Sequence, residues 1–310
     1  MNRHVARDIS YAHSAETRGG RAVIRAMEAA SGRFGLIRRA AGYDIDVAAG
    51  ACFWTVMKER YGVSLEVIGG SLDNLPKTGP LITVSNHPYG ILDGLMLGHL
   101  LATRRGDFRI LANAVFRKAR DLDRVILPIR FDDNRAALAQ NISTRAEALR
   151  YLGQGGAIGV FPGGTVSTAA RPFGVPMDPL WRSFTAKMIA KSDAAVVPVY
   201  FDGHTSRLFQ IASHLHPSLR MGLLIREFRT RVDGPLRVVI GKPLPRKELV
   251  ARRANGKAMM DFLRRSTYEL SPEPYANFDY GHEFEAKHRA PKPSAERVWN
   301  RRGSNGRRRF

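Results

Sequence analysis

Short apolar runs alternate with longer amphipathic stretches along most of the chain. The runs are rich in β-branched residues, which is typical of buried strands, and they fall at 63–70, 81–86, 108–113, 124–131, 157–162, 194–201 and 236–241. Residues 134–153 and 179–192 instead carry apolar positions at helical spacing. This alternation predicts an α/β fold, in which a mostly parallel sheet is layered between flanking helices.

The N-terminal part of the chain has a helical pattern. Residues 21–42 place apolar side chains among arginines, with a break near Ser31 and Gly32, and residues 50–61 continue helically. Two interpretations of the basic amphipathic helices are open. Their apolar face lies in the headgroup region of an anionic membrane, or it packs on the protein core and leaves a basic face in water.

These patterns divide the chain into four parts. Residues 1–75 form an N-terminal basic helical segment, residues 76–248 the α/β core, and residues 249–282 a C-terminal helix and loop. Residues 283–310 combine Pro, Ser, Gly and Asn with runs of arginine, a composition typical of a disordered basic tail. We see neither a transmembrane-length apolar stretch nor a secretory signal, and therefore expect a cytoplasmic protein.

Charge and cysteine content narrow the classes of partner. The 310 residues carry a net charge of +21, which attracts anionic lipid headgroups, acidic carrier proteins and nucleic acids. No nucleic-acid recognition motif accompanies the charge, so no nucleic acid is expected. The single cysteine, Cys52, has no partner for a disulfide or a thiolate metal site, and we expect no metal.

A histidine directly follows one predicted strand, in the stretch VSNHPYGILDGLMLG at 84–98. Pro88 disfavours helical backbone at His87, and Gly90 permits a sharp turn, so a helix should begin just afterwards. Asp93 then lies in the first helical turn and folds back toward His87. The carboxylate fixes the imidazole tautomer and leaves the other nitrogen as a base, or Asp93 only stabilises the helix N-terminus. Both interpretations are open from the spacing alone.

A second predicted strand ends at Phe161 and leads into the turn of FPGGTVS. Gly163 and Gly164 expose backbone N–H groups, and Thr165 and Ser167 add hydroxyls, which together suit an anion or an oxyanion. The stretch lacks the Gly-Lys-Ser/Thr of a phosphate-binding P-loop. Taken alone, such a turn also fits a simple connection between elements.

Together these segments resemble the glycerophospholipid acyltransferase family, over about residues 80–245. NHPYGILDG resembles the family's His-Asp motif, FPGGTVS its Phe-Pro-Glu-Gly-Thr substrate motif, and VVPVYFDG its later Val-Pro-Val block. ILPIRFDDNRAA lies where the family has a strand followed by a substrate-contacting arginine, for which Arg135 is the match. The resemblance is closest to a branch with bacterial haemolysin-like proteins and ornithine-lipid O-acyltransferases, which share the HPYG turn.

The resemblance implies an O-acyltransferase with His87 as general base and Asp93 orienting it. The implied substrate contacts are Asn86, Arg135, Gly163, Gly164, Thr165 and Ser167. A fatty acyl chain would move from acyl carrier protein or coenzyme A to the hydroxyl of lysophosphatidic acid or a lyso-aminolipid, in membrane lipid synthesis. The implied enzyme needs no cofactor beyond this co-substrate, and it works peripherally on the anionic, cytoplasmic face of a membrane.

Two departures from the family pattern affect this hypothesis. Five residues separate His87 from Asp93 where the family has four, and Gly163 and Val166 replace the usual Glu and following Arg of the substrate motif. The second departure disfavours a glycerol-phosphate acceptor and favours an acceptor without phosphate. A non-catalytic lipid- or acyl-binding relative is the main alternative, and a nucleic-acid-binding protein comes third.

Overall fold

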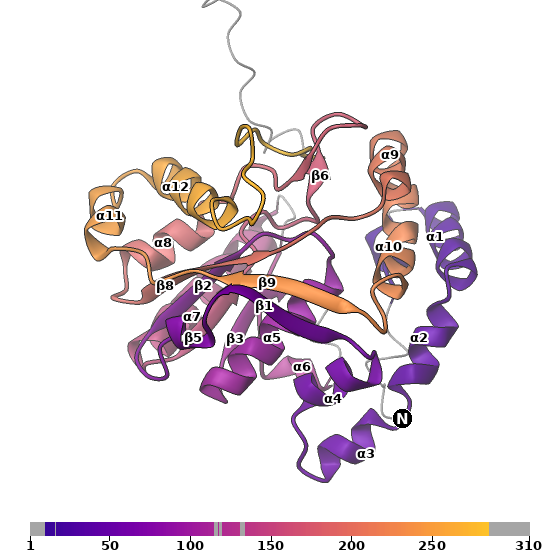
Figure 1. Ribbon diagram of the computed structural model, residues 1–310, viewed down its shortest axis with the longest axis horizontal. Coiled ribbons are helices and arrows are strands. Elements are labelled where there is room, and N and C mark those ends of the chain that lie inside the picture. The colour runs from indigo at the N-terminus through magenta and orange to yellow at the C-terminus, as the bar shows by residue number, and fades with distance from the viewer. Residues whose placement is uncertain (1–9, 16, 115–116, 118–119, 131–133, 285–310) are drawn as a thin grey trace, which may run out of the picture.

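A seven-stranded sheet forms the centre of the protein in a computed structural model that describes residues 10–15, 17–114, 117, 120–130 and 134–284. Its strand order is β1-β9-β8-β2-β5-β3-β4 (Figure 1). The strands are β1 (Ser64–Gly70), β2 (Leu81–Ser85), β3 (Arg109–Asn113), β4 (Ile126–Ile129), β5 (Ala157–Val160), β8 (Ala195–Phe201) and β9 (Pro235–Ile240). Every neighbouring pair is parallel except β8 with β9. The predicted mostly parallel α/β sheet is confirmed.

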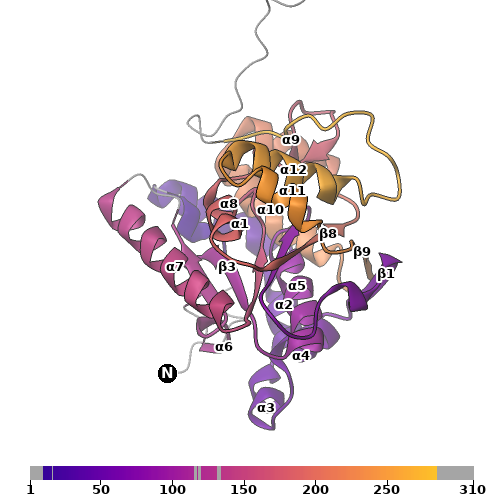
Figure 2. The same cartoon turned by 90° about the vertical axis from the view of Figure 1, so that its left-hand side faces the viewer.

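Helices cover both faces of the sheet. Figure 2 shows α11 (Arg246–Ala251) and α12 (Gly256–Tyr268) on one side and α4 (Phe53–Arg60) and α5 (Ile91–Arg105) on the other. Two further helices, α7 (Arg135–Gly153) and α8 (Phe184–Ala190), pack with α11 and α12. Strand β2 is buried along its whole length, with Leu81 in one core and Ile82 in the other. A continuously apolar strand is expected where a parallel sheet is covered on both faces.

The N-terminal helices pack on the protein. Helix α1 (Arg18–Ala30) runs along α10 (Pro217–Arg229), and α2 (Arg33–Ala40) and α3 (Tyr43–Ala48) follow it (Figure 1). Ile24 of α1 and Leu36 of α2 are buried in the core, as the second interpretation of 21–42 predicts, whereas Val23 and Phe34 are exposed. The break falls where it was predicted, and Gly32 has φ 97°, a left-handed conformation that suits glycine.

Residues from both flanking segments complete the central unit. Strand β1 pairs with β9, so the sheet includes residues before 76, and α12 packs on β8, so residues after 248 cover the sheet. Of the predicted tail, Glu283 and Phe284 are described: Glu283 is buried, and the Phe284 ring lies 4.4 Å from the Arg220 guanidinium. The rest of that predicted tail, 285–310, lies outside the described residues.

The prediction of a helix over 179–192 was wrong at its start. Helix α8 begins only at Phe184, because tertiary hydrogen bonds hold the preceding residues in another conformation. The Arg182 backbone N–H donates to the Pro162 carbonyl over 3.0 Å, and the Trp181 indole N–H donates to the nearby Asp178 carboxylate over 2.8 Å. Local periodicity cannot register a partner such as Pro162, which lies elsewhere in the chain.

Several smaller elements complete the fold. They are the 3₁₀ helices η2 (Ala12–Ser14) and η3 (Leu72–Asn74), helix α6 (Arg120–Asp123), the hairpin strands β6 (Thr168–Ala169) and β7 (Pro176–Met177), and helix α9 (Arg207–Leu215). Strands β6 and β7 form a separate two-stranded sheet. Within the described ranges, none of the helices combines the length and apolarity needed to cross a membrane.

Candidate active site

His87 lies just beyond the carboxyl end of β2, at the edge where parallel α/β sheets bind ligands. The chain turns at Gly90, which has φ 76°, and α5 begins at the next residue. The Asp93 carboxylate closes this turn, because its Oδ2 accepts the backbone N–H groups of Tyr89 and Gly90 over 2.7 and 2.9 Å. Asp93 therefore caps the N-terminus of α5.

The same carboxylate lies against the histidine ring. Asp93 Oδ2 is 3.0 Å from His87 Nδ1, and the Asp93 side chain is fully buried. Nδ1 is buried as well, which leaves Nε2 for the cavity that His87 lines. Burial raises the pKa of the Asp93 carboxyl above its usual range, and the contacts with His87 and the two backbone N–H groups oppose that rise. Asp93 thus caps the helix and sits beside His87, so its two interpretations are compatible.

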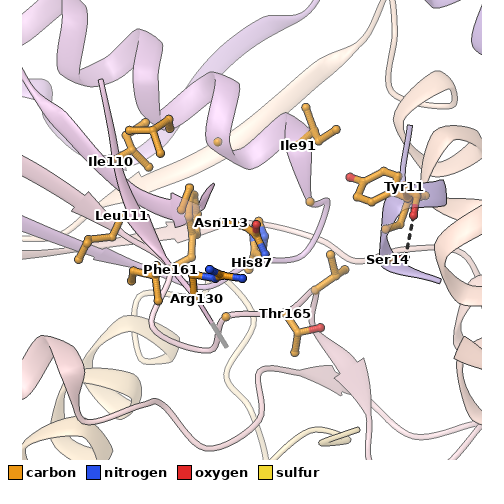
Figure 3. Close-up of a pocket in the computed structure, with 18 of the residues that line it drawn as sticks. Tyr11, Ser14, His87, Ile91, Ile110, Leu111, Asn113, Arg130, Phe161 and Thr165 are labelled. Carbon is orange, nitrogen blue, oxygen red and sulfur yellow. Dashed lines mark hydrogen bonds between the residues drawn. The ribbon is translucent and has the colours of Figure 1, made fainter. Parts of the chain in front are cut away.

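The two sequence motifs meet in space although they are far apart in the chain. The Ser167 backbone N–H donates to the His87 carbonyl over 2.8 Å. The Phe161 ring stacks on the imidazole with a centroid separation of 4.4 Å. The turn after β5 therefore forms one wall of the site around His87 (Figure 3).

The residues expected to contact substrate fall into two groups. Gly164, Thr165 and Arg135 line the same cavity as His87. Gly163 does not, because a side chain built on it would point at Asp178, 3.2 Å away.

Asn86 and Ser167 also lie outside the cavity lining, and their side chains are buried. The Asn86 amide exchanges two hydrogen bonds with the backbone of Phe201 on β8, over 2.7 and 2.9 Å. The Ser167 hydroxyl donates to the Asp178 carboxylate. Both side chains join elements of the fold, which corrects the expectation that they contact substrate.

The backbone of the FPGGTVS turn also differs from expectation. The Gly164 N–H donates to the Phe161 carbonyl over 3.0 Å, so the turn itself uses this donor. Gly164 has φ 67°, whereas Gly163 does not adopt a left-handed conformation. Because Thr165 lines the cavity, its hydroxyl is a better candidate donor to an oxyanion than the Gly164 N–H.

The cavity around His87 measures about 1360 Å³, and its lining combines apolar side chains with arginines. The apolar side chains include Trp54 and Met57 of α4, Leu95 of α5, Ile110 of β3 and Phe228 of α10. Among the described residues of the cavity lining there are no Asp or Glu side chains but six arginines: Arg21, Arg25, Arg130, Arg135, Arg182 and Arg220.

Asp178 is a site residue that sequence reasoning missed. Its buried carboxylate accepts the His87 backbone N–H over 3.2 Å, the Ser167 hydroxyl and the Trp181 indole N–H. One carboxylate therefore fixes the His87 turn relative to the FPGGTVS turn. An isolated Asp between Met177 and Pro179 gives no sequence signal for this role.

Arg220, from α10, is a second site residue that was missed. Its Nη2 donates to Thr165 Oγ1 over 2.9 Å and to the Val166 carbonyl over 2.8 Å, while Nη1 donates to the hydroxyls of Thr168 and Ser213. Burial lowers the pKa of Arg220 to about 9, which still leaves the guanidinium charged at neutral pH. Because Thr165 Oγ1 accepts from Arg220, the hydrogen of the Thr165 hydroxyl is available to the cavity.

A third missed residue is Arg130, at the end of β4. Its backbone N–H donates to the Asn141 side chain over 3.0 Å, and its carbonyl accepts from the same amide over 2.8 Å. In Figure 3, Arg130 lies on the same side of the cavity as His87 and Phe161. Arg130 thus joins Arg135 among the arginines that line the cavity, whereas the motif alone had indicated Arg135.

Comparison with known proteins defines the class of this chain. A family model described as acyltransferase matches residues 48–275. The chain therefore belongs to this acyltransferase family, and the resemblance predicted from the His-Asp, Phe-Pro-Gly-Gly-Thr and Val-Pro-Val segments is confirmed.

Two curated relatives give the chemistry of similar proteins. The chain is 32% identical over 205 residues to a lyso-glycine lipid O-acyltransferase from Bacteroides thetaiotaomicron, covering 63% of this chain and 71% of that protein. It is 28% identical over 204 residues to a lyso-glycine lipid O-acyltransferase from Phocaeicola vulgatus, covering 63% and 70%. A solved structure, the 1-acyl-sn-glycerophosphate acyltransferase PlsC from Thermotoga maritima, matches with 18% identity and a TM-score of 0.39 over 77% of this chain and 88% of that chain.

Two substitutions of Gly164 should separate the effect of a side chain in the cavity on activity from the effect of backbone strain on stability. Gly164→Val places a β-branched residue at φ 67° and a side chain in the cavity, so it should abolish acyl transfer and lower the melting temperature. Gly164→Asn, which tolerates this backbone conformation, should also lose activity but keep a melting temperature closer to the wild type. Acyl transfer and thermal unfolding measure the two effects. Wild-type turnover by both variants would reduce FPGGTVS to a connecting turn.

Proposed function

We propose that this protein transfers a fatty acyl group from a coenzyme A or acyl carrier protein thioester to the hydroxyl of an anionic lysolipid. The observation that carries the proposal is that His87, paired with Asp93, lines one cavity whose lining combines apolar side chains with six arginines. An acyl chain suits the apolar side chains, and anionic groups of donor and acceptor suit the arginines. The reacting atoms would then meet at His87.

The proposed chemistry needs one base and one oxyanion donor. His87 Nε2 takes the proton of the acceptor hydroxyl, and Asp93 stabilises the imidazolium that forms. The hydroxyl oxygen attacks the thioester carbonyl carbon, and the resulting oxyanion accepts a hydrogen bond from Thr165. As the carbon–sulfur bond breaks, the imidazolium returns its proton to the departing thiolate. An ester and a free thiol are the products, and no acyl-enzyme forms.

The acceptor is proposed to be a lyso-aminolipid with a carboxylate. Both curated relatives are named lyso-glycine lipid O-acyltransferases, which supports an acceptor of this class. Val166 stands where the family motif has an arginine, yet Arg220 brings a guanidinium to the same turn from α10. Its four terminal hydrogen bonds go to the protein, so Arg220 acts by holding Thr165 and by its charge, while Arg130 and Arg135 are the candidates for direct anion contact.

The proposed setting is the cytoplasmic face of a membrane, to which the protein binds peripherally. The net charge of +21 supports association with anionic lipid headgroups and with acidic acyl carrier protein. This setting brings a membrane-embedded acceptor and a soluble thioester donor together at one site. The pathway would be membrane lipid synthesis.

Acceptor competition tests this proposal. Purified protein with a labelled acyl thioester should esterify lyso-glycine lipid with a higher kcat/KM than lysophosphatidic acid, and each donor should be tried as coenzyme A and acyl carrier protein thioester. A preference for lysophosphatidic acid would overturn the assignment of the acceptor. Tight binding of both lipids without any ester product would favour a non-catalytic lipid-binding protein.

The role of Thr165 can be isolated with a matched variant. Thr165→Val removes the hydroxyl that faces the cavity and should lower kcat by roughly 10²-fold, the usual effect of losing one oxyanion donor. Thr168→Val also removes one acceptor of Arg220, but Thr168 lies outside the cavity lining, so its kcat should stay near the wild type. Steady-state kinetics with a saturating donor measure both. Equal losses in the two variants would indicate a structural role for the Arg220 network only.

A further inference from the structure

Four large apolar side chains lie exposed near one another on a part of the protein that the reaction does not use. Phe173 and Val175, in the connection between β6 and β7, are 78% and 62% exposed. Leu208 and Leu215, seven residues apart on the outward side of α9, are 51% and 70% exposed. We call this surface the α9–hairpin face. Exposed apolar side chains that gather in this way mark an interaction site.

The α9–hairpin face behaves as one unit. Arg207 Nη1, at the start of α9, donates to the Gly174 carbonyl in the hairpin connection over 2.9 Å. Near the other end of α9, His214 Nε2 lies 2.9 Å from the Ala169 carbonyl of β6. Helix α9 contacts β6, as Figure 1 also shows. The opposite side of α9 is buried, so the helix already packs on the core and its apolar outer side does not contribute to that packing.

Arginines flank the face, and acidic residues are absent from its sequence. Arg171 and Arg207 are exposed beside Phe173 and Leu208, respectively. Residues 158–177 and 203–226, which contain the hairpin and α9, include no Asp or Glu. An apolar centre with a basic surround matches the interface of an anionic bilayer, where apolar side chains enter the headgroup region and arginines meet phosphates.

Helices α10 and α1 connect the α9–hairpin face to the lining of the active-site cavity. Helix α10 begins directly after α9, and a side chain on Gly20 of α1 would lie 3.3 Å from the Ser218 hydroxyl in the first turn of α10. Farther along the same two helices, Arg21 and Arg25 of α1 and Met221 of α10 line the cavity.

We propose that the α9–hairpin face docks on an anionic lipid bilayer, with Phe173 and Leu215 inserted at the level of the headgroups. This inference rests on the proposed function for its purpose, the capture of a membrane-embedded acceptor. On α1 and α2, Ile24 and Leu36 are buried in the core, while Val23 and Phe34 are 46% and 62% exposed. Docking through α9 assigns the lipid contact to side chains that are free to make it.

Vesicle binding by matched variants of the full chain tests the docking face. Phe173→Ser combined with Leu215→Ser should lower the partition coefficient onto phosphatidylglycerol–phosphatidylcholine vesicles by about tenfold or more. The control combines Ile45→Ser on α3, which is 71% exposed, with Val250→Ser on α11, which is 52% exposed. The control should bind like the wild type. Arg171→Gln should weaken binding at low salt and have little effect at high salt.

Activity on two forms of acceptor separates this inference from the proposed function. The Phe173→Ser/Leu215→Ser variant should retain acyl transfer to a monomeric short-chain lysolipid within about twofold, and lose transfer to vesicle-embedded acceptor in parallel with its loss of binding. Equal vesicle binding by this variant and the control would overturn the docking face. So would a wild-type dimer that the variant dissociates, since the face would then join two copies. Absence of transfer to the monomeric acceptor by the wild type would instead count against the proposed function.

Discussion

His87→Ala should lower acyl transfer by about 10² to 10⁴-fold, with a larger loss if the imidazole also positions the acceptor hydroxyl. The ring lines the cavity with Nε2 available, and Asp93 lies 3.0 Å from its Nδ1. Removing the ring therefore removes the group that accepts the hydroxyl proton. Steady-state kinetics should show the loss mainly in kcat, because the arginines and apolar side chains proposed to bind the substrates are unchanged.

Another histidine, His99 on α5, provides the control for the effect of His87→Ala. His99 is half-buried, its Nδ1 lies 3.4 Å from the Thr55 hydroxyl, and it does not line the cavity. His99→Ala should lose some stability and keep acyl transfer. Thermal unfolding should find both variants folded. A folded His87→Ala protein with undiminished turnover would rule out His87 as the base.

Asp93→Asn should lower turnover by about 10² to 10⁴-fold, because the amide cannot stabilise the imidazolium with a negative charge. Its remaining oxygen can still accept the backbone N–H groups of Tyr89 and Gly90, so the start of α5 should persist. Donor binding should remain near normal. The double variant with His87→Ala should be scarcely slower than His87→Ala alone, because the two residues act on one proton transfer.

The difference in folding stability between the wild type and Asp93→Asn should depend on pH. Burial raises the pKa of the Asp93 carboxyl in the folded protein above its pKa in the unfolded chain. At a pH between these two pKa values, the folded protein therefore binds the Asp93 proton more tightly than the unfolded chain does. Ionisation of Asp93 at neutral pH therefore costs folding free energy, and the cost disappears as the pH falls through the folded pKa. The wild type should gain stability relative to Asp93→Asn on acidification. Denaturant unfolding at several pH values measures the difference, and a relative loss on acidification would contradict the direction of the shift.

The fold was largely predictable because its signals are local. The buried strands β2, β5 and β8 are continuous apolar runs, and the long helix α7 has a clear helical period. The signals failed where tertiary hydrogen bonds decide the conformation, as in residues 179–183 before α8. The helices α9 and α10 were not predicted, although they supply Arg220 and the α9–hairpin face.

The candidate site was predictable only in part, for a related reason. The HPYG turn constrains its own geometry, so the approach of Asp93 to His87 followed from Pro88, Gly90 and the helix start. Proximity to a motif did not reveal where a side chain points. The side chains of Asn86 and Ser167 point into the fold, and a side chain built on Gly163 would point at Asp178. Asp178 and Arg220 were missed because their contacts span long sequence separations.

A single-turnover experiment with purified full-length protein tests the central claim most directly. The protein is mixed with a thioester labelled in its acyl chain, first alone and then with lyso-glycine lipid, and the label is followed in protein, donor and lipid. Direct transfer to a hydroxyl predicts that the label stays on the donor until the lysolipid is added, and then appears in an ester product at a rate that His87→Ala abolishes. Label bound covalently to the protein before the lysolipid is added, or no labelled ester from folded protein, would contradict the account.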